Sequence, residues 1–176
     1  MKYLKVFVIA AFSFIMTNAI FGQSFNIDDS KIALQGYSPV SYIDMNLAQR
    51  GSTNHKSEYD GLKYYFTNAE QKAKFDANPS KYLPAFGGWC ATGIAVGAKF
   101  RTDPNKFLVR DGNLYLFLYD LEVDALQLWL DDEKGMTKKA NKNWDERFPI
   151  DECLNDSKDY VERQQKILDS FREKLE

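Results

Sequence analysis

Residues 82–91 read Tyr-Leu-Pro-Ala-Phe-Gly-Gly-Trp-Cys-Ala, so that one thiol, Cys90, directly follows a pair of glycines. Paired glycines let the backbone turn with positive φ or approach another group closely. A cysteine at such a turn can be a buried core residue, half of a disulfide, a metal ligand or a nucleophile. A helix predicted to begin near Ala91 would lower the pKa of the Cys90 thiol and favour the thiolate.

Two β-hairpins are predicted on either side of this turn. An Asp-Gly pair between β-forming residues is a strong local hairpin signal. The pair occurs twice, at Asp60-Gly61 and at Asp111-Gly112. The strands predicted to pair are residues 57–59 with 63–66, and residues 106–110 with 114–118.

A short helix is predicted after the first hairpin. Asn68 is a suitable N-cap, and Asn78-Pro79 is predicted to end the helix. The candidate inward positions are Ala69, Ala73 and Phe75.

After the second hairpin the apolar spacing changes from about two residues to about 3.6, which predicts helices. The apolar positions of the first of them are Leu121, Ala125, Leu128 and Trp129. Gly135 is predicted to close this helix as its C-cap. Another helix is predicted over Met136–Arg147, with Ala140 and Trp144 directed inward.

The last segment, Asp156–Glu176, is predicted as an amphipathic helix. Its stripe consists of Tyr160, Gln164, Ile167, Leu168, Phe171 and Leu175. This stripe can dock on its own domain or pair with its copy in a homodimer. Fewer than three heptads are present, which favours docking within the chain.

The succession of strands and then helices predicts an α+β fold, with two β-hairpins packed by short helices. We expect a signal peptide over residues 1–22, one domain over residues 23–149 and a helical extension over residues 150–176. No internal repeat is visible in the sequence.

The start of the chain has the layout of a secretory signal peptide. Lys2 and Lys5 precede an apolar run of 11 residues, Val6–Met16, and cleavage is predicted near Gly22. The run is shorter than the about 20 residues that a membrane span needs. The protein is therefore predicted to be secreted, in the periplasm, with no membrane span.

The composition excludes one class of partner. The chain has 23 basic and 25 acidic side chains, a net charge of −2, and no basic stripe. Nucleic-acid binding therefore has no electrostatic support. Only two cysteines and one histidine are available for thiol or imidazole chemistry.

Five motifs occur in a fixed order along the chain. They are Gly36-Tyr37-Ser38-Pro39-Val40-Ser41-Tyr42, Tyr59-Asp60-Gly61-Leu62-Lys63-Tyr64-Tyr65-Phe66, Phe75-Asp76-Ala77-Asn78-Pro79-Ser80-Lys81-Tyr82, Phe86-Gly87-Gly88-Trp89-Cys90-Ala91 and Asp111-Gly112-Asn113-Leu114-Tyr115-Leu116. In this order they make the chain resemble the secreted branch of the YHS-domain family, over about residues 32 to 145. The resemblance implies a compact α+β module and a link to heavy-metal handling.

The chain departs from this family at two positions. Related short modules carry cysteines after the hairpin strand and in the following helix, where this chain has Thr67 and Gln71. Neither side chain can replace a thiolate as a soft ligand. Only Cys90 matches a cysteine of the secreted branch, so the metal role is not carried over through Thr67 and Gln71.

Cys90 and His55 are the candidate metal ligands, for copper, zinc or a haem-type group. His55 lies in a polar, irregular segment, Leu47–Ser57, where a solvated loop residue is the alternative interpretation. One Cys and one His make half of a tetrahedral zinc site. A soft ion of lower coordination number would need fewer ligands from this chain. A site completed by a second subunit would also need fewer.

A small-ligand site is the related hypothesis. Its candidate residues are Cys90, Trp89, Gly88, Tyr37 and Tyr59, with the aromatic rings as pocket walls. Packing of these rings in the core is the alternative.

These interpretations lead to three alternative hypotheses about function. The first is a non-enzymatic binding module for a soft metal ion or small ligand at Cys90. The second is a structural or interaction protein, in which a Cys90–Cys153 disulfide closes a loop of about 63 residues. The third is a thiol-dependent enzyme or redox protein, with His55 as the base.

Overall fold

The computed structural model describes residues 25–118, 122–147 and 169. Four predicted features lie outside these residues: the signal peptide, Leu121, Cys153 and, apart from Asp169, the C-terminal helix. The described part is an α+β fold with two separate two-stranded antiparallel sheets, as predicted. Its strands are β1 (Ser52–Tyr59), β2 (Leu62–Phe66), β3 (Asp103–Arg110) and β4 (Asn113–Phe117). Its helices are η1 (Ala33–Gly36), α1 (Pro39–Met45), α2 (Ala69–Ala77), η2 (Pro79–Tyr82), η3 (Ala85–Gly88), α3 (Ala91–Ala95), α4 (Ala125–Asp131) and α5 (Glu133–Arg147).

Both predicted hairpins are confirmed. β1 pairs with β2 and β3 with β4, each around an Asp-Gly turn. Asp60 and Gly61 have φ of 49° and 72°, and Asp111 and Gly112 have φ of 52° and 77°. Two consecutive positive φ angles are what a type I′ hairpin turn requires, which explains the strength of the Asp-Gly signal.

Helix α2 begins and ends as predicted, but its inward residues differ. The Asn68 side chain accepts a hydrogen bond from the Gln71 amide and so caps the helix. Phe75 is buried, whereas Ala69 and Ala73 are exposed. Gln71, a polar residue, takes the second buried position because hydrogen bonds satisfy its amide.

The predicted end of the next helix is wrong. Gly135 does not close α4 but lies inside α5. The carboxylate of Asp132 accepts a hydrogen bond from the Gly135 amide at 3.0 Å, and this is the bond by which an N-cap starts a new helix. The inward positions predicted for α5 are confirmed, since Ala140 is fully buried and Trp144 half-buried.

The described residues contain an internal structural repeat, although no repeat is visible in the sequence. Repeat 1 (residues 33–77) and repeat 2 (residues 85–131) have the same order of elements: a short 3₁₀ helix, a short α-helix, a hairpin and a capped helix. The hairpins also share one register, with an irregularity in the same place, between Ser52 and Lys56 in one and between Asp103 and Phe107 in the other.

The entry into each repeat is the most similar part. Leu34 and Phe86 both have a φ of 53°, and the glycines that follow two residues later, Gly36 and Gly88, have φ of 84° and 80°. Bulky residues rarely adopt positive φ, so the shared conformation indicates the same local design. A parallel bridge of Ile32 with Lys63 has its counterpart in that of Pro84 with Leu114.

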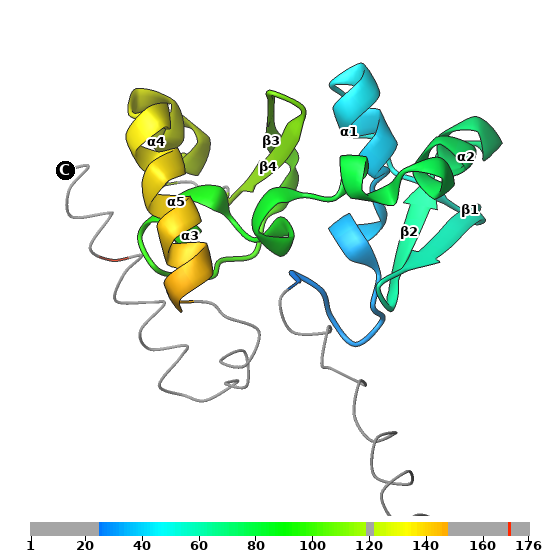
Figure 1. Ribbon diagram of the computed structural model, residues 1–176, viewed down its shortest axis with the longest axis horizontal. Coiled ribbons are helices and arrows are strands. Elements are labelled where there is room, and N and C mark those ends of the chain that lie inside the picture. Colours follow the sequence, from blue (N-terminus) through cyan, green and yellow to red (C-terminus); the bar gives the residue numbers. More distant parts are fainter. Residues whose placement is uncertain (1–24, 119–121, 148–168, 170–176) are drawn as a thin grey trace, which may run out of the picture.

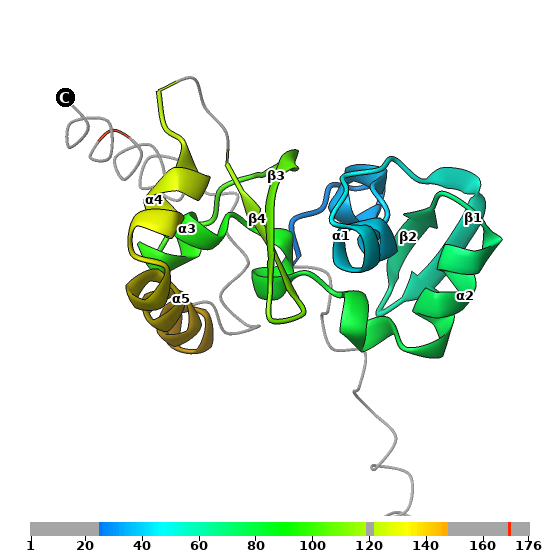
Figure 2. The ribbon, with the colours of Figure 1, turned by 90° about the horizontal axis from the view of Figure 1, so that it is seen from above.

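The two repeats lie side by side, with repeat 1 on the right and repeat 2, followed by α5, on the left (Figures 1 and 2). They meet in a cluster of buried residues: Leu34 and Tyr42 from repeat 1, and Leu114 and Leu116 from repeat 2. The Tyr42 hydroxyl donates a hydrogen bond to the Pro104 carbonyl at 2.7 Å. Each repeat also has its own core, around Phe75 in repeat 1 and Trp129 in repeat 2.

The segment before repeat 1 also joins the two halves. Phe25 and Ile27 pack on the core of repeat 1. Between them, the Asn26 amide donates to the Gly87 carbonyl at 2.8 Å, and its side chain donates to the Gly88 carbonyl at 3.1 Å. The N-terminal segment is therefore a third structural link between the repeats.

Candidate functional site

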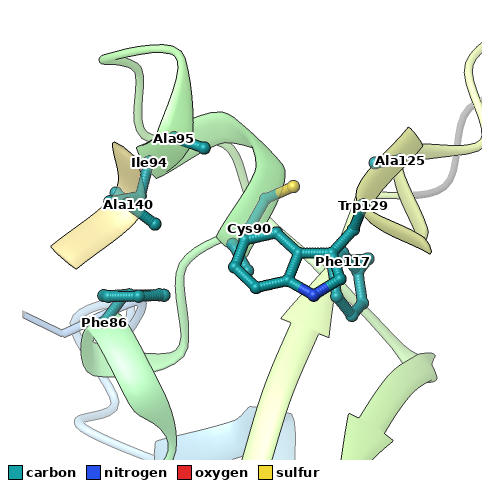
Figure 3. Packing of buried hydrophobic residues seen from close by; sticks show 9 residues of the cluster. Phe86, Cys90, Ile94, Ala95, Phe117, Ala125, Trp129 and Ala140 are labelled. Atoms are coloured by element: carbon teal, nitrogen blue, oxygen red, sulfur yellow. The ribbon is translucent and has the colours of Figure 1, made fainter. Parts of the chain in front are cut away.

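Cys90 is the N-cap of α3 and lies in the core of repeat 2. Its side chain is 1 % exposed and belongs to the cluster that contains Trp129 and Phe117 (Figure 3). The Cys90 sulfur accepts a hydrogen bond from the Gly93 amide at 3.4 Å. Ser38, at the equivalent position of repeat 1, accepts the same bond from the Ser41 amide, also at 3.4 Å. Local structure thus gives Cys90 the capping role of a serine.

Burial raises the pKa of the Cys90 thiol from its ordinary value of 9.0. The backbone amides of Leu118, Gly93 and Thr92 act in the opposite direction, but the loss of hydration has the larger effect. The predicted lowering of this pKa is therefore wrong. Helix α3 has only five residues, and its few amides do not offset complete burial.

We expect this raised pKa to reduce stability at high pH. The folded state holds the Cys90 proton more tightly than the unfolded state does, so the contribution is complete below pH 9.0 and is lost as pH rises through the folded-state pKa. The free energy of unfolding of the parent protein should fall more steeply above about pH 9 than that of Cys90→Ala, by up to about 1.4 kcal/mol per pH unit. The free energy of unfolding is measured by urea titration at several pH values. Equal slopes of this free energy against pH in the two proteins would contradict the raised pKa.

A small cavity adjoins the Cys90 side chain. Its apolar walls are Phe100, Leu118, Val123, Ala125 and Leu128. The space is about 10 Å³, enough for one water-sized molecule or ion. The hydroxyl of Thr92, which also lines the cavity, donates to the Ala125 carbonyl at 2.7 Å. Cys90 therefore supplies the side-chain atom best suited to bind a soft ligand there.

Trp89 and Gly88 lie next to Cys90 in sequence but face other surroundings. Trp89 is half-buried, and the Lys99 ammonium lies 5.7 Å from its ring centroid. The buried indole nitrogen of Trp89 finds no hydrogen-bond partner among the described residues. The Gly88 carbonyl accepts hydrogen bonds from Asn26 and Thr102, at the junction of the repeats. The glycine pair therefore positions the thiol without lining its cavity.

The other candidate residues lie in repeat 1. Tyr37 stacks on Tyr42, with ring centroids 6.5 Å apart, and Tyr59 packs edge-on against Phe75 at 6.2 Å. Both rings are half-buried, so they serve the packing of the junction and of the first core. The structure does not bring them to the cavity beside Cys90.

His55 is also remote from Cys90. It lies within strand β1, half-buried, and not in the irregular loop predicted from the sequence. Strand β1 and helix α3 lie on opposite sides of the molecule in both views (Figures 1 and 2). The predicted Cys90–His55 metal pair is therefore not formed within one chain, because the two residues belong to different repeats. Over the described residues, no group of three or more His, Cys, Asp or Glu side chains could hold a metal ion.

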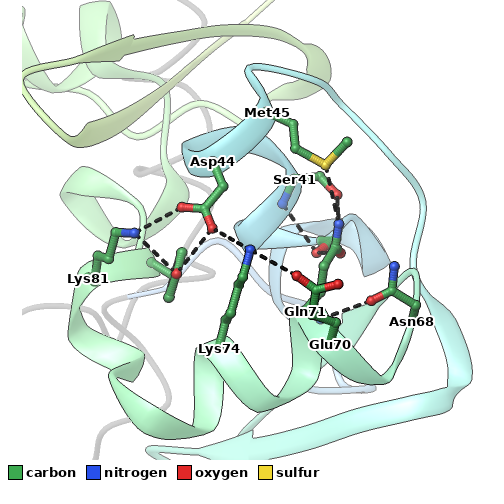
Figure 4. Close-up of polar contacts among 10 residues, drawn as sticks. Ser41, Asp44, Met45, Asn68, Glu70, Gln71, Lys74 and Lys81 are labelled. Carbon is green, nitrogen blue, oxygen red and sulfur yellow. Dashed lines mark hydrogen bonds and ion pairs between the residues drawn. The ribbon is translucent and has the colours of Figure 1, made fainter.

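Thr67 and Gln71 come together in a buried polar network of repeat 1. The side-chain oxygen of Gln71 accepts hydrogen bonds from the Thr67 amide and from the Ser38 hydroxyl, at 3.2 and 2.7 Å. The side-chain nitrogen of Gln71 donates to Ser41 at 2.9 Å and to Met45 sulfur at 3.6 Å (Figure 4). Hydrogen bonds between uncharged groups therefore satisfy the buried polar atoms around Gln71.

Charged residues surround this network on the outside. Asp44 forms ion pairs with Lys81 at 2.9 Å and with Lys74 at 3.5 Å, and Lys74 also pairs with Glu70 (Figure 4). These pairs are partly exposed and contribute little stability. Ser38 and Ser41 were not among the predicted site residues, although Gly36-Tyr37-Ser38-Pro39 is the sequence signal of a helix start.

Comparison with known proteins finds no matching family model, no matching curated protein and no matching solved structure. Among the described residues, no helix is both long and apolar enough to cross a membrane.

Proposed function

We propose that this protein is an exported, non-enzymatic binding module of the YHS type, which holds a soft metal ion or a small thiophilic ligand at Cys90. The observation that supports the proposal is that Cys90, whose sulfur accepts a hydrogen bond from the Gly93 amide, also lines an apolar cavity. Amide hydrogen bonds to sulfur favour the thiolate that a bound metal needs.

The chemistry of the cavity favours a soft ion with few ligands. One sulfur and apolar walls do not suit zinc, which takes four ligands in structural sites. A hard cation would need oxygen ligands, and the Thr92 hydroxyl is already bonded. A haem-type group is far larger than the space of about 10 Å³. Copper(I), which thiolates select, fits these limits best.

Binding at a protonated thiol releases a proton. Because the pKa of Cys90 is raised, the thiol is neutral at pH 7, and copper(I) must displace its proton. We expect the apparent affinity to rise about tenfold per pH unit up to the pKa of the thiol.

Copper(I) titration of the exported protein tests the proposal. The Cys153→Ser variant, which removes the second thiol, should bind one equivalent of copper(I). The matched variant with Cys90→Ser in addition should lose at least about a hundredfold in affinity, while its serine still caps α3. Absence of binding to Cys153→Ser, or equal binding by both variants, would refute the metal site.

A structural protein is the second candidate, and one specific observation favours it. Ser38 performs the same capping bond as Cys90, so this position needs no thiol chemistry. Under this alternative Cys90 is a core residue or is joined to Cys153. The intact mass of the exported protein distinguishes them, since a disulfide removes two hydrogens. An enzyme is disfavoured because the predicted base, His55, lies in the other repeat.

A further inference from the structure

A second cavity lies at the junction between the repeats. The N-terminal segment and both repeats line it, through Asn26, Gln35, Tyr64, Gly88 and Thr102 together with apolar side chains. The space is about 10 Å³, which is the volume that one water molecule needs. This cavity is separate from the one beside Cys90.

Tyr64 lines this cavity and carries an unsatisfied polar group. The residue is 1 % exposed, and its hydroxyl has no hydrogen-bond partner among the described residues. Its ring is held in the first core, 4.8 Å from the ring of Phe75. A buried hydroxyl without a partner is costly, so native proteins usually pair it with protein or with an ordered water.

Other residues of the lining offer polar groups to a bound molecule. The Gly87 carbonyl accepts a hydrogen bond from the Asn26 amide, and its second lone pair can accept another. The Thr102 hydroxyl donates to the Gly88 carbonyl at 3.2 Å and accepts from the Asn26 side chain at 3.1 Å, so its oxygen keeps one lone pair for a further donor. A buried water needs two to four such partners.

We propose that this cavity binds one water molecule, which hydrogen-bonds to the Tyr64 hydroxyl and links repeat 1 to the polar groups of repeat 2. None of the described residues that line the cavity is charged, so the site suits a neutral molecule rather than an ion. Its volume excludes any larger ligand. The proposal does not depend on the function of Cys90.

Tyr64→Phe tests this water site by calorimetry of the full exported protein. If water bonds to the hydroxyl, removing the hydroxyl should lower the Tm by about 2–6 °C, because the bound water loses a partner. If the hydroxyl is unpaired, its removal relieves an unsatisfied group and the Tm should stay or rise. The second result would overturn the proposal.

Tyr115→Phe is the matched control, because Tyr115 occupies the equivalent position in repeat 2. It is half-buried and lies away from the junction cavity, so the change should shift the Tm by less than about 1 °C. A high-resolution crystal structure gives the direct measurement. A water within hydrogen-bond distance of the Tyr64 hydroxyl supports the proposal, and a hydroxyl bonded to protein or an empty cavity refutes it.

Discussion

Trp129→Ala is expected to lower the free energy of unfolding by about 3–5 kcal/mol. The indole is fully buried in the core of repeat 2, with Tyr115 and Phe117 at ring-centroid distances of 5.3 and 5.8 Å. Replacing it leaves a large cavity among rings that belong to a hairpin and cannot collapse onto alanine. Urea unfolding followed by circular dichroism measures the loss without relying on tryptophan fluorescence.

Leu130→Ala is the matched control for this change. Leu130 is the next residue of α4 but is 42 % exposed, so its replacement should cost less than about 1 kcal/mol. Similar losses for the two variants would show that Trp129 is not the centre of this core.

Tyr42→Ala is expected to cost about 3–4 kcal/mol and to separate the unfolding of the two repeats. Tyr42 is fully buried at their junction, packs edge-on against Phe107 at 4.8 Å and donates to the Pro104 carbonyl. All three tryptophans of the chain, Trp89, Trp129 and Trp144, lie in repeat 2 or in α5. Fluorescence therefore follows that half, whereas circular dichroism follows both.

The two signals should give one coincident transition for the parent protein and two different midpoints for Tyr42→Ala. Tyr42→Phe keeps the ring and removes only the hydrogen bond, so we expect a loss of about 1 kcal/mol and coincident transitions. Coincident transitions in Tyr42→Ala, with stability unchanged, would mean that the repeats are coupled elsewhere.

Features set by a few neighbouring residues were predicted well. The Asp-Gly turns, the Asn68 cap and the helix after Cys90 each depend on contacts within about four residues. Gly135 was misread for a related reason: glycine can end a helix, but Asp132 three residues earlier accepts its amide and starts one. Both signals were in the sequence, and the capping bond decided between them.

The internal repeat had a weak signal that could have been found. An alanine, a glycine and an aromatic residue occur in the same order at Ala33, Gly36 and Tyr37, and again 52 residues later at Ala85, Gly88 and Trp89. Many other equivalent positions differ in chemistry, as Ser38 and Cys90 do, because each repeat packs its own core. The two repeats therefore share their backbone conformation even at positions where their side chains differ.

The sequence by itself determined the α+β class, the two hairpins and the placement of the thiol at a helix start. Only the tertiary structure decided the surroundings of these groups. Burial among the residues of repeat 2 raises the pKa of Cys90, although local amides alone would lower it. The packing of the two repeats likewise keeps His55 away from Cys90 and brings Tyr64 to the junction. Local bonds act over a few residues, whereas burial and distance depend on segments that are far apart in the chain.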